Sequence, residues 1–134
     1  YSCDQLVGDN PPGPWISLPF QKTFAFLSVP RISTVGTLTV AVEGRGFDDV
    51  TWKGNFIMVR GEHGEELGRL FDGEGRDVSM QDGGPISDSI TISQETMLAM
   101  TADRDVVLHL STPPMRDGEI RIRWMKLSFA PSGF

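Results

Sequence analysis

The sequence has only one cysteine, Cys3, and no long apolar run. A single thiol cannot form a disulfide within the chain, and it cannot build the cysteine-based sites that hold structural zinc. A membrane-spanning helix needs about 18 consecutive apolar residues, and residues 1–4 do not resemble a signal peptide. Because the chain begins without methionine, we expect it to be part of a longer protein.

Positive charge is also scarce. The chain carries 12 lysines and arginines against 18 acidic residues, which gives a net charge of -6 and a pI near 4.8. Nucleic acids and anionic membrane surfaces are captured by clustered lysine and arginine. The composition therefore predicts no nucleic-acid partner and no membrane insertion.

Signatures of catalysis are missing as well. The two histidines, His63 and His109, stand in a polar loop and on the polar side of a predicted strand, without a convergent partner. No serine lies in a nucleophile elbow, and no motif marks a pair of glycosidase carboxylates among the acidic residues. We therefore expect no enzyme, and a hydrolase domain is the least favoured alternative.

Turn-forming residues are abundant, with 15 glycines and 9 prolines in 134 residues. This length suits one domain, and this composition suits many short strands joined by tight turns. Residues 8–14 contain three prolines and cannot form a regular element. We predict a linker or lead-in over residues 1–14 and a single β-sandwich domain over residues 15–134.

Extended segments are predicted at residues 15–20, 23–29, 37–43, 55–60, 66–71, 87–93, 105–111 and 119–129. In the clearest of them Leu38, Val40 and Val42 alternate with polar residues, which is the strand period. Segments 55–60 and 66–71 should pair as a hairpin. One short helix is predicted at 94–101, with Ser93 as its N-cap.

The last predicted strand changes its pattern halfway. Its apolar positions are first Ile120, Ile122 and Trp124 and then shift by one residue to Met125, Leu127 and Phe129. This shift indicates either a β-bulge or a stretch buried on both faces. We expect Trp124 in the core.

Polar residues in these strands suggest one further feature. Arg121 and Arg123 alternate with the apolar positions and, together with His109, are predicted to form a polar stripe on one sheet face. The ordinary alternative is a solvated face.

The absence of a βαβ alternation predicts an all-β fold. Uneven connections favour a jelly roll over a simple meander. We expect an antiparallel two-sheet β-sandwich of the jelly-roll kind, with about eight strands and one short helix.

Two acidic loops are the candidate metal site. One carries Asp48 and Asp49, and the other carries Asp72, Glu74 and Asp77, both with neighbouring glycines. Calcium takes six to eight oxygens from carboxylates and loop carbonyls, so calcium is the candidate cofactor. The alternative is that these residues only form solvated turns, and their spacing does not match the helix-loop-helix calcium pattern.

The first of these loops also contains the candidate ligand-binding residues, Trp52 with Asp48 and Lys53. An exposed indole beside charged groups suits carbohydrate or protein binding. The alternative for Trp52 is a plug that closes one end of the sandwich.

The order of several segments resembles β-sandwich modules of bacterial secreted and surface proteins. The segments are residues 36–40, 46–48, 56–59, 64–70 and 89–93. The resemblance implies an extracellular or cell-surface, non-enzymatic module with an aspartate-containing calcium loop, which Asp48 matches and beside which Asp49 stands. The chain departs from that loop at Arg45, where a carboxylate would be expected.

The function predicted from the sequence is therefore a non-catalytic binding or adhesion module of a larger secreted or surface protein. We expect it to be stabilised by calcium and to recognise carbohydrate or protein through its loops. The alternative is a structural jelly-roll domain of a viral, phage or surface assembly.

Overall fold

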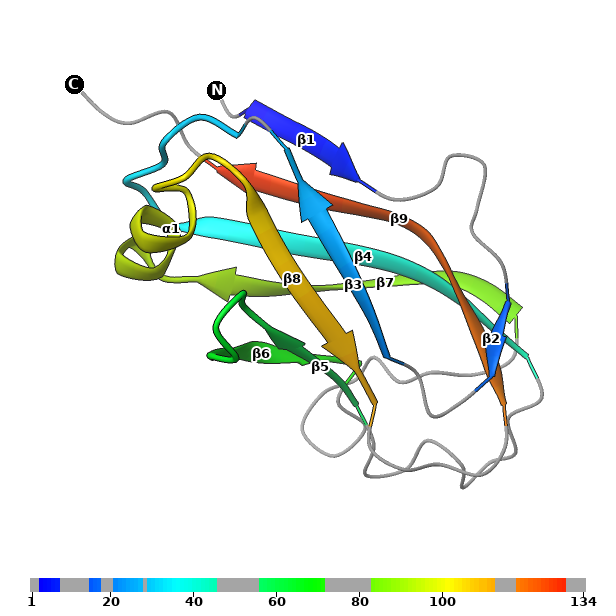
Figure 1. Cartoon of the computed structure of the whole chain (residues 1–134). Helices are drawn as coiled ribbons and strands as arrows, with labels where there is room; N and C mark the ends of the chain where they lie inside the picture. Colours follow the sequence, from blue (N-terminus) through cyan, green and yellow to red (C-terminus); the bar gives the residue numbers. More distant parts are fainter. Residues whose placement is uncertain are drawn as a thin grey trace.

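The computed structural model describes residues 3–7, 15–17, 21–27, 29–45, 56–71, 83–112 and 118–129 (Figure 1). Its elements are all strands except for one helix. In chain order they are β1 (Cys3–Val7), β2 (Ile16–Ser17), β3 (Gln21–Phe26), β4 (Gly36–Arg45), β5 (Ile57–Arg60), β6 (Glu66–Leu70), β7 (Gly83–Ile92), α1 (Gln94–Met100), β8 (Val106–Ser111) and β9 (Glu119–Phe129).

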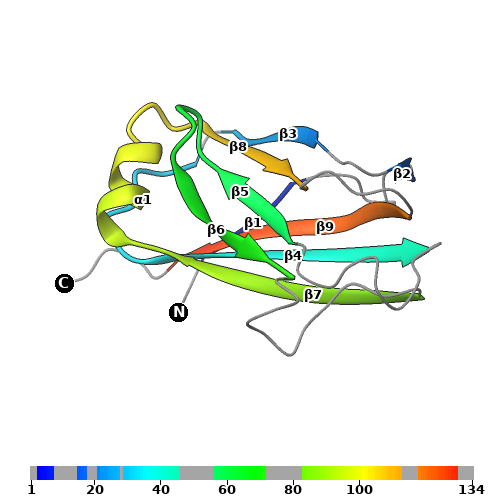
Figure 2. The same cartoon turned by 90° about the horizontal axis from the view of Figure 1, so that it is seen from below.

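The strands form two antiparallel sheets that face each other, with α1 at one end (Figure 2). The first sheet has the order β1-β9-β4-β7, with β2 also paired to β9, and the second has the order β3-β8-β5-β6. Apart from the short β2 and the β5–β6 hairpin, each strand is followed by one in the opposite sheet. This is the connectivity of a jelly roll, so the predicted fold class is confirmed.

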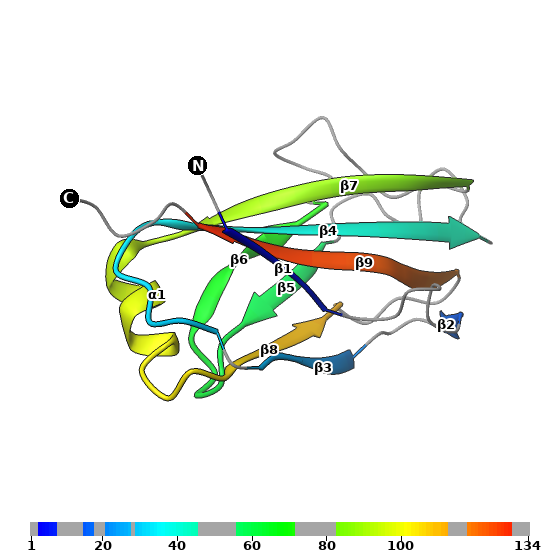
Figure 3. The same cartoon turned by 90° about the horizontal axis from the view of Figure 1, so that it is seen from above.

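β1 and β2 lie along the same edge of β9 (Figure 3). β4 occupies the other edge of β9 from Glu119 to Phe129. β1 falls within the lead-in predicted for residues 1–14, but it extends the first sheet, with Cys3 opposite Phe129. Its five residues show no apolar alternation, so only the pairing with β9 defines this strand.

The core lies between the two sheets and is formed mainly by alternate side chains of β3, β4, β8 and β9 and by the apolar residues of β5 and β6. Leu38, Val40 and Val42 of β4 are fully buried, as their alternation predicts. The other sheet and β9 face them with Phe24, Phe26, Ile57, Val59, Leu70, Leu108, Leu110, Ile120, Met125 and Leu127.

β9 contains the bulge that its sequence pattern predicts. Ala41 pairs with Trp124 and Val42 pairs with Ile122, which leaves Arg123 as an extra residue in β9. The extra residue shifts the inward positions by one and turns Trp124 to the outside, where it is 37% exposed. The bulge is confirmed, and the prediction that Trp124 belongs to the core is wrong.

α1 begins where the sequence predicts. The Ser93 hydroxyl accepts a hydrogen bond from the backbone N–H of Thr96 at 3.2 Å, as an N-cap does. Thr101 follows the helix and is fully buried. Its hydroxyl donates to the Met97 carbonyl at 2.7 Å and accepts from the Ile32 N–H at 2.9 Å. This hydroxyl therefore ties the β3–β4 connection to the helix.

With seven residues, α1 is too short to cross a membrane, and it is the one helix in the described part of the chain.

Replacing Thr101 with valine tests this tie. Valine has nearly the same shape but leaves the Ile32 N–H without its buried partner, so we expect the free energy of unfolding to fall by about 1–3 kcal/mol. Thr91→Val, which removes an exposed hydroxyl from β7, is the matched control. Urea unfolding measures both, and equal effects would show that the buried hydrogen bond contributes nothing.

Candidate functional site

The loop residues predicted to bind metal or ligand lie outside the described residues: Asp48, Asp49, Trp52, Lys53, Asp72, Glu74 and Asp77. The strands that flank these loops are described. Gly44 pairs with Gly83, and Ile57 pairs with Leu70. One loop runs from β4 to β5, and the other runs from β6 to β7. Because β4 pairs with β7 and β5 pairs with β6, the described residues that flank the two loops are neighbours at both ends.

Asp88 holds the residue that begins the second of these loops. It lies on β7 opposite Val40, on the core side, and is only 6% exposed. One carboxylate oxygen accepts a hydrogen bond from the Phe71 N–H at 2.8 Å, and Phe71 has a left-handed φ of 55°. Asp88 is not among the predicted site residues, although its carboxylate stands at a core-facing position between Ile86 and Ile90, which is a detectable signal.

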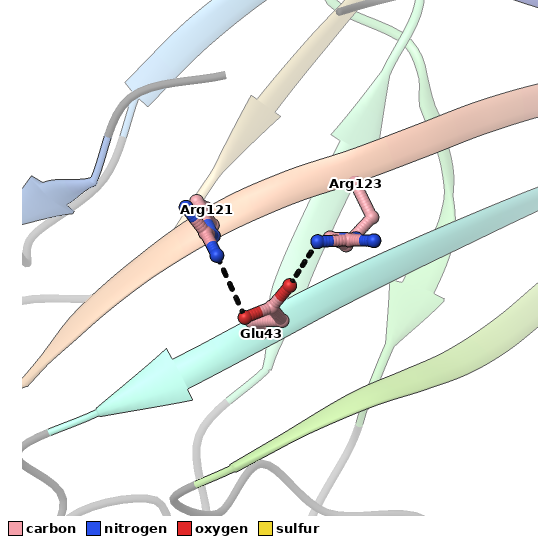
Figure 4. A network of polar contacts seen from close by, with 3 residues as sticks. All are labelled: Glu43, Arg121 and Arg123. Atoms are coloured by element: carbon pink, nitrogen blue, oxygen red, sulfur yellow. Dashed lines mark hydrogen bonds and ion pairs between the residues drawn. The ribbon is translucent and has the colours of Figure 1, made fainter. Parts of the chain in front are cut away.

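Charged side chains gather on the outer face of the first sheet. Glu43 of β4 accepts hydrogen bonds from Arg121 at 3.1 Å and from Arg123 at 2.6 Å, both on β9 (Figure 4). Two residues further along β4, Arg45 forms an ion pair with Glu119 of β9 at 2.9 Å. These pairs follow from the register, in which Glu43 lies opposite Arg121 and Arg45 lies opposite Glu119.

Trp15, just before β2, lies against this network. Its ring centroid is 4.1 Å from the guanidinium carbon of Arg45 and 4.8 Å from that of Arg121. Guanidinium groups at this distance are attracted by the negative face of the indole. Trp15 therefore helps to fix the two arginines in place.

We call this surface the charged face. It comprises Trp15, Glu43, Arg45, Glu119, Arg121, Arg123, Trp124 and Lys126. Its four basic residues and two carboxylates sum to a charge of +2, whereas the whole chain has a charge of -6. The bulge in β9 places Arg123 and Trp124, which are adjacent in sequence, on this same side.

Glu43 stays ionised within the charged face. Burial alone would raise its pKa, but the hydrogen bonds and the positive charges of Arg121 and Arg123 outweigh this effect and lower the pKa below the ordinary value of 4.5. A carboxylate with this environment organises the two guanidinium groups and is unsuited to donate a proton at neutral pH.

The predicted polar stripe is correct for Arg121 and Arg123 and wrong for His109. β8, which carries His109, belongs to the other sheet, and the imidazole Nδ1 lies 2.8 Å from the hydroxyl of Thr23 on β3. Sequence periodicity assigns a residue to the polar side of its strand, but it does not say to which sheet the strand belongs. His63 is exposed in the β5–β6 loop, as predicted.

A cavity of about 530 Å³ lies between the β5–β6 loop and α1. Its lining includes the carboxylates of Glu62, Glu65, Glu95 and Asp103 together with His63. Among the described residues, no three His, Cys, Asp or Glu side chains are placed to hold a metal ion.

No protein-family model matches this chain, and no curated protein matches it by sequence. Among solved structures it is similar to part of dimeric latent PorU from Porphyromonas gingivalis, with a TM-score of 0.60 and 12% identity. That match covers 96% of this chain and 12% of PorU. The structure of infectious bursal disease virus Gt strain gives a TM-score of 0.40 at 12% identity, over 100% of this chain and 32% of the viral one.

The resemblance to PorU extends to the fold alone at this identity. The predicted similarity to bacterial β-sandwich modules is therefore confirmed for the fold alone, by the resemblance to one bacterial protein, PorU. No family or sequence match supports the aspartate-containing calcium loop.

Replacing Glu43 with glutamine tests the electrostatics of the charged face. A carboxyl group whose pKa is lower in the folded state stabilises the fold above its unfolded pKa, and this contribution is lost as the pH falls through the folded value. We therefore expect the difference in unfolding free energy between wild type and Glu43→Gln to be full at pH 7 and to shrink below pH 4.5. Thermal melts between pH 3 and 7 measure it, and a difference independent of pH would contradict the assignment.

Proposed function

We propose that this chain is a non-catalytic binding module that recognises carbohydrate on the charged face. The observation that carries the proposal is the bulge in β9, which brings Arg123 and the exposed Trp124 side by side to the outer surface. Bulges are over-represented next to functional sites, at sheet edges and at barrel rims, where they re-aim a side chain. An indole offers a flat apolar surface to a sugar ring, and a neighbouring guanidinium offers hydrogen-bond donors to its oxygens.

The composition of the face favours a sugar over a protein partner. β9 points Arg121, Arg123 and Lys126 outward around a single exposed large apolar side chain, Trp124. Toward β7 the surface continues with hydroxyl groups, where those of Thr39 and Ser89 lie 2.8 Å apart. Such a polar surface suits the many hydroxyl groups of a carbohydrate.

The absence of catalysis is part of the proposal. Hydrolysis of a glycosidic bond needs one carboxylic acid that keeps its proton and a second carboxylate. Glu43 has a lowered pKa and Glu119 is paired with Arg45. Both carboxylates of the charged face are therefore ion-pair partners of its arginines.

We further propose that calcium binds the two acidic loops. The support is the sequence of Asp48, Asp49, Asp72, Glu74 and Asp77, together with the described strand ends that flank both loops. The hydrogen bond from the Phe71 N–H to Asp88 fixes the chain immediately before Asp72. In this view Trp52 and Lys53 extend the ligand surface from the first loop.

We place the module in a longer secreted or cell-surface protein, where polysaccharides are accessible ligands. The resemblance of the sequence to bacterial surface modules supports this location. The chain spans 12% of the length of PorU, the bacterial structure that it resembles, so a module of this size can form a small part of a large protein.

A structural role in an assembly is the second candidate. Leu27 and Val35, at 61% and 51% exposure, are the most exposed large apolar side chains of the described residues, and both flank the β3–β4 connection. Analytical ultracentrifugation distinguishes the two roles, since a stable oligomer lost in Leu27→Ser and Val35→Ser variants supports assembly.

Trp124→Ala tests the carbohydrate proposal. Because most of the indole is buried and 37% is exposed, we expect the melting temperature to fall by a few degrees. The affinity of the folded variant for a polysaccharide that the wild type binds should fall about tenfold or more. Affinity electrophoresis against neutral and acidic soluble polysaccharides measures this. Leu98→Ala, which truncates a side chain on α1 with the same 37% exposure, should bind as wild type does, and equal binding by the Trp124 variant would refute the stacking role.

Calcium titration tests the loop proposal. A ligand that binds only the folded state raises stability with its concentration, so millimolar calcium should raise the melting temperature, and chelator should reverse the shift. The shift should disappear in an Asp48→Asn, Asp72→Asn double variant and persist in Glu62→Gln at the other end of the molecule. A wild-type melting temperature that calcium leaves unchanged would remove calcium from the proposal.

A further inference from the structure

The arginines of the charged face have more hydrogen-bond donors than the face can use. Each guanidinium has five N–H groups, and Arg121 and Arg123 share the two oxygens of Glu43. The two side chains are 29% and 36% exposed, so their remaining terminal N–H groups reach solvent. Two cations that share one carboxylate keep a net positive charge and free donor positions, which is an incomplete site for an anion.

The distribution of charge supports the same conclusion. A chain with a net charge of -6 as a whole repels an acidic polymer. The charged face, at +2, is an exception that would orient such a polymer. Fixing the arginines against Trp15 lowers the entropy lost when they bind.

We infer that the ligand of the charged face is an acidic carbohydrate, whose carboxylate or sulfate binds Arg121 and Arg123 while its sugar ring lies against Trp124. This inference rests on the proposed carbohydrate function and names the class of sugar. The two contacts are compatible in one residue of the polymer because Arg123 and Trp124 are neighbours in the chain, with α-carbons about 3.8 Å apart. A uronic acid or a sulfated sugar carries its anionic group on or next to the ring, so both can be engaged together.

The shape of the guanidinium group also favours an anion that presents two or more oxygens. Arginine presents a fixed fork that matches two oxygens of a carboxylate or sulfate. Glu43 holds that fork in place from the β4 side. Glu43 is therefore a positioning residue, and it contributes to binding through the two arginines.

The experiment compares acidic polymers with neutral counterparts that have similar sugar rings. Polygalacturonate is tested against its methyl ester, and dextran sulfate against dextran, by calorimetry with the full chain at 50 and 300 mM NaCl. We expect at least one acidic member to bind and its neutral counterpart to bind at least tenfold more weakly, with the acidic affinity reduced by salt.

Variants connect the preference to the site. Arg123→Gln should reduce the acidic affinity about tenfold, since it removes a charge-assisted hydrogen bond, and should reduce any neutral binding less, since the glutamine amide still donates to sugar hydroxyl groups. Arg60→Gln is the matched control, because Arg60 lies on the other sheet and also forms an exposed ion pair, with Glu66 at 3.6 Å. It should bind as wild type does, and melting curves confirm that both variants fold.

The outcomes separate the two proposals. Equal binding of acidic and neutral polymers, lost in Trp124→Ala, would overturn the acidic ligand and keep the carbohydrate function. Binding of no carbohydrate would overturn both. Equally tight binding of poly-L-glutamate would overturn the inference in favour of an acidic protein partner.

Discussion

The pairing of β4 with β9 is the contact on which the rest of the structure depends. It runs from Gly36 opposite Phe129 to Arg45 opposite Glu119, through the centre of the first sheet. On the inner side it places Leu38, Val40 and Val42 in the core, and on the outer side it brings Glu43 to its arginines. Because side chains alternate along a strand, one register sets both the hydrophobic core and the charged face.

A single extra residue in β9 allows this strand to contribute to both the hydrophobic core and the charged face. Without the bulge at Arg123, a strand that buries Ile120 and Ile122 would also bury Trp124 and would turn Met125 and Leu127 outward. With the bulge, all four aliphatic and thioether side chains stay in the core and Trp124 joins the arginines outside. The chemistry of the face is thus a consequence of how the strand preserves its core.

Much of the fold follows from local patterns in the sequence. The alternation in β4, the cap at Ser93 and the parity shift in β9 predict their elements because each depends on neighbouring residues. The edge strand β1 is not predictable in this way, since its position depends on pairing with β9, more than a hundred residues away. The sheet to which His109 belongs is a tertiary property for the same reason.

The site was harder to predict than the fold. The shift from Trp124 to Met125 predicts the bulge, but an indole in an apolar series is more often buried, so the pattern does not predict that Trp124 lies outside. The alternation in β9 predicts Arg121 and Arg123 as a polar stripe. Their shared partner Glu43 lies on β4, 78 residues from Arg121 in the sequence, and local patterns do not identify it. Asp88 interrupts the apolar alternation of β7, which marks it in the sequence, but its partner is a backbone N–H, which side-chain patterns do not identify.

The proximity of the first and last described strands has a consequence for attachment. Cys3 lies opposite Phe129, so a circular permutant joining the two would need only a short connecting peptide. Glu119, at the far end of β9, is ten residues from Phe129, or about 33 Å along an extended strand. A fusion partner or host domain tethered at residues 3 or 129 would therefore attach at the end of the sandwich remote from Arg45 and Arg121, and a long polymer could lie across those arginines without meeting the tether.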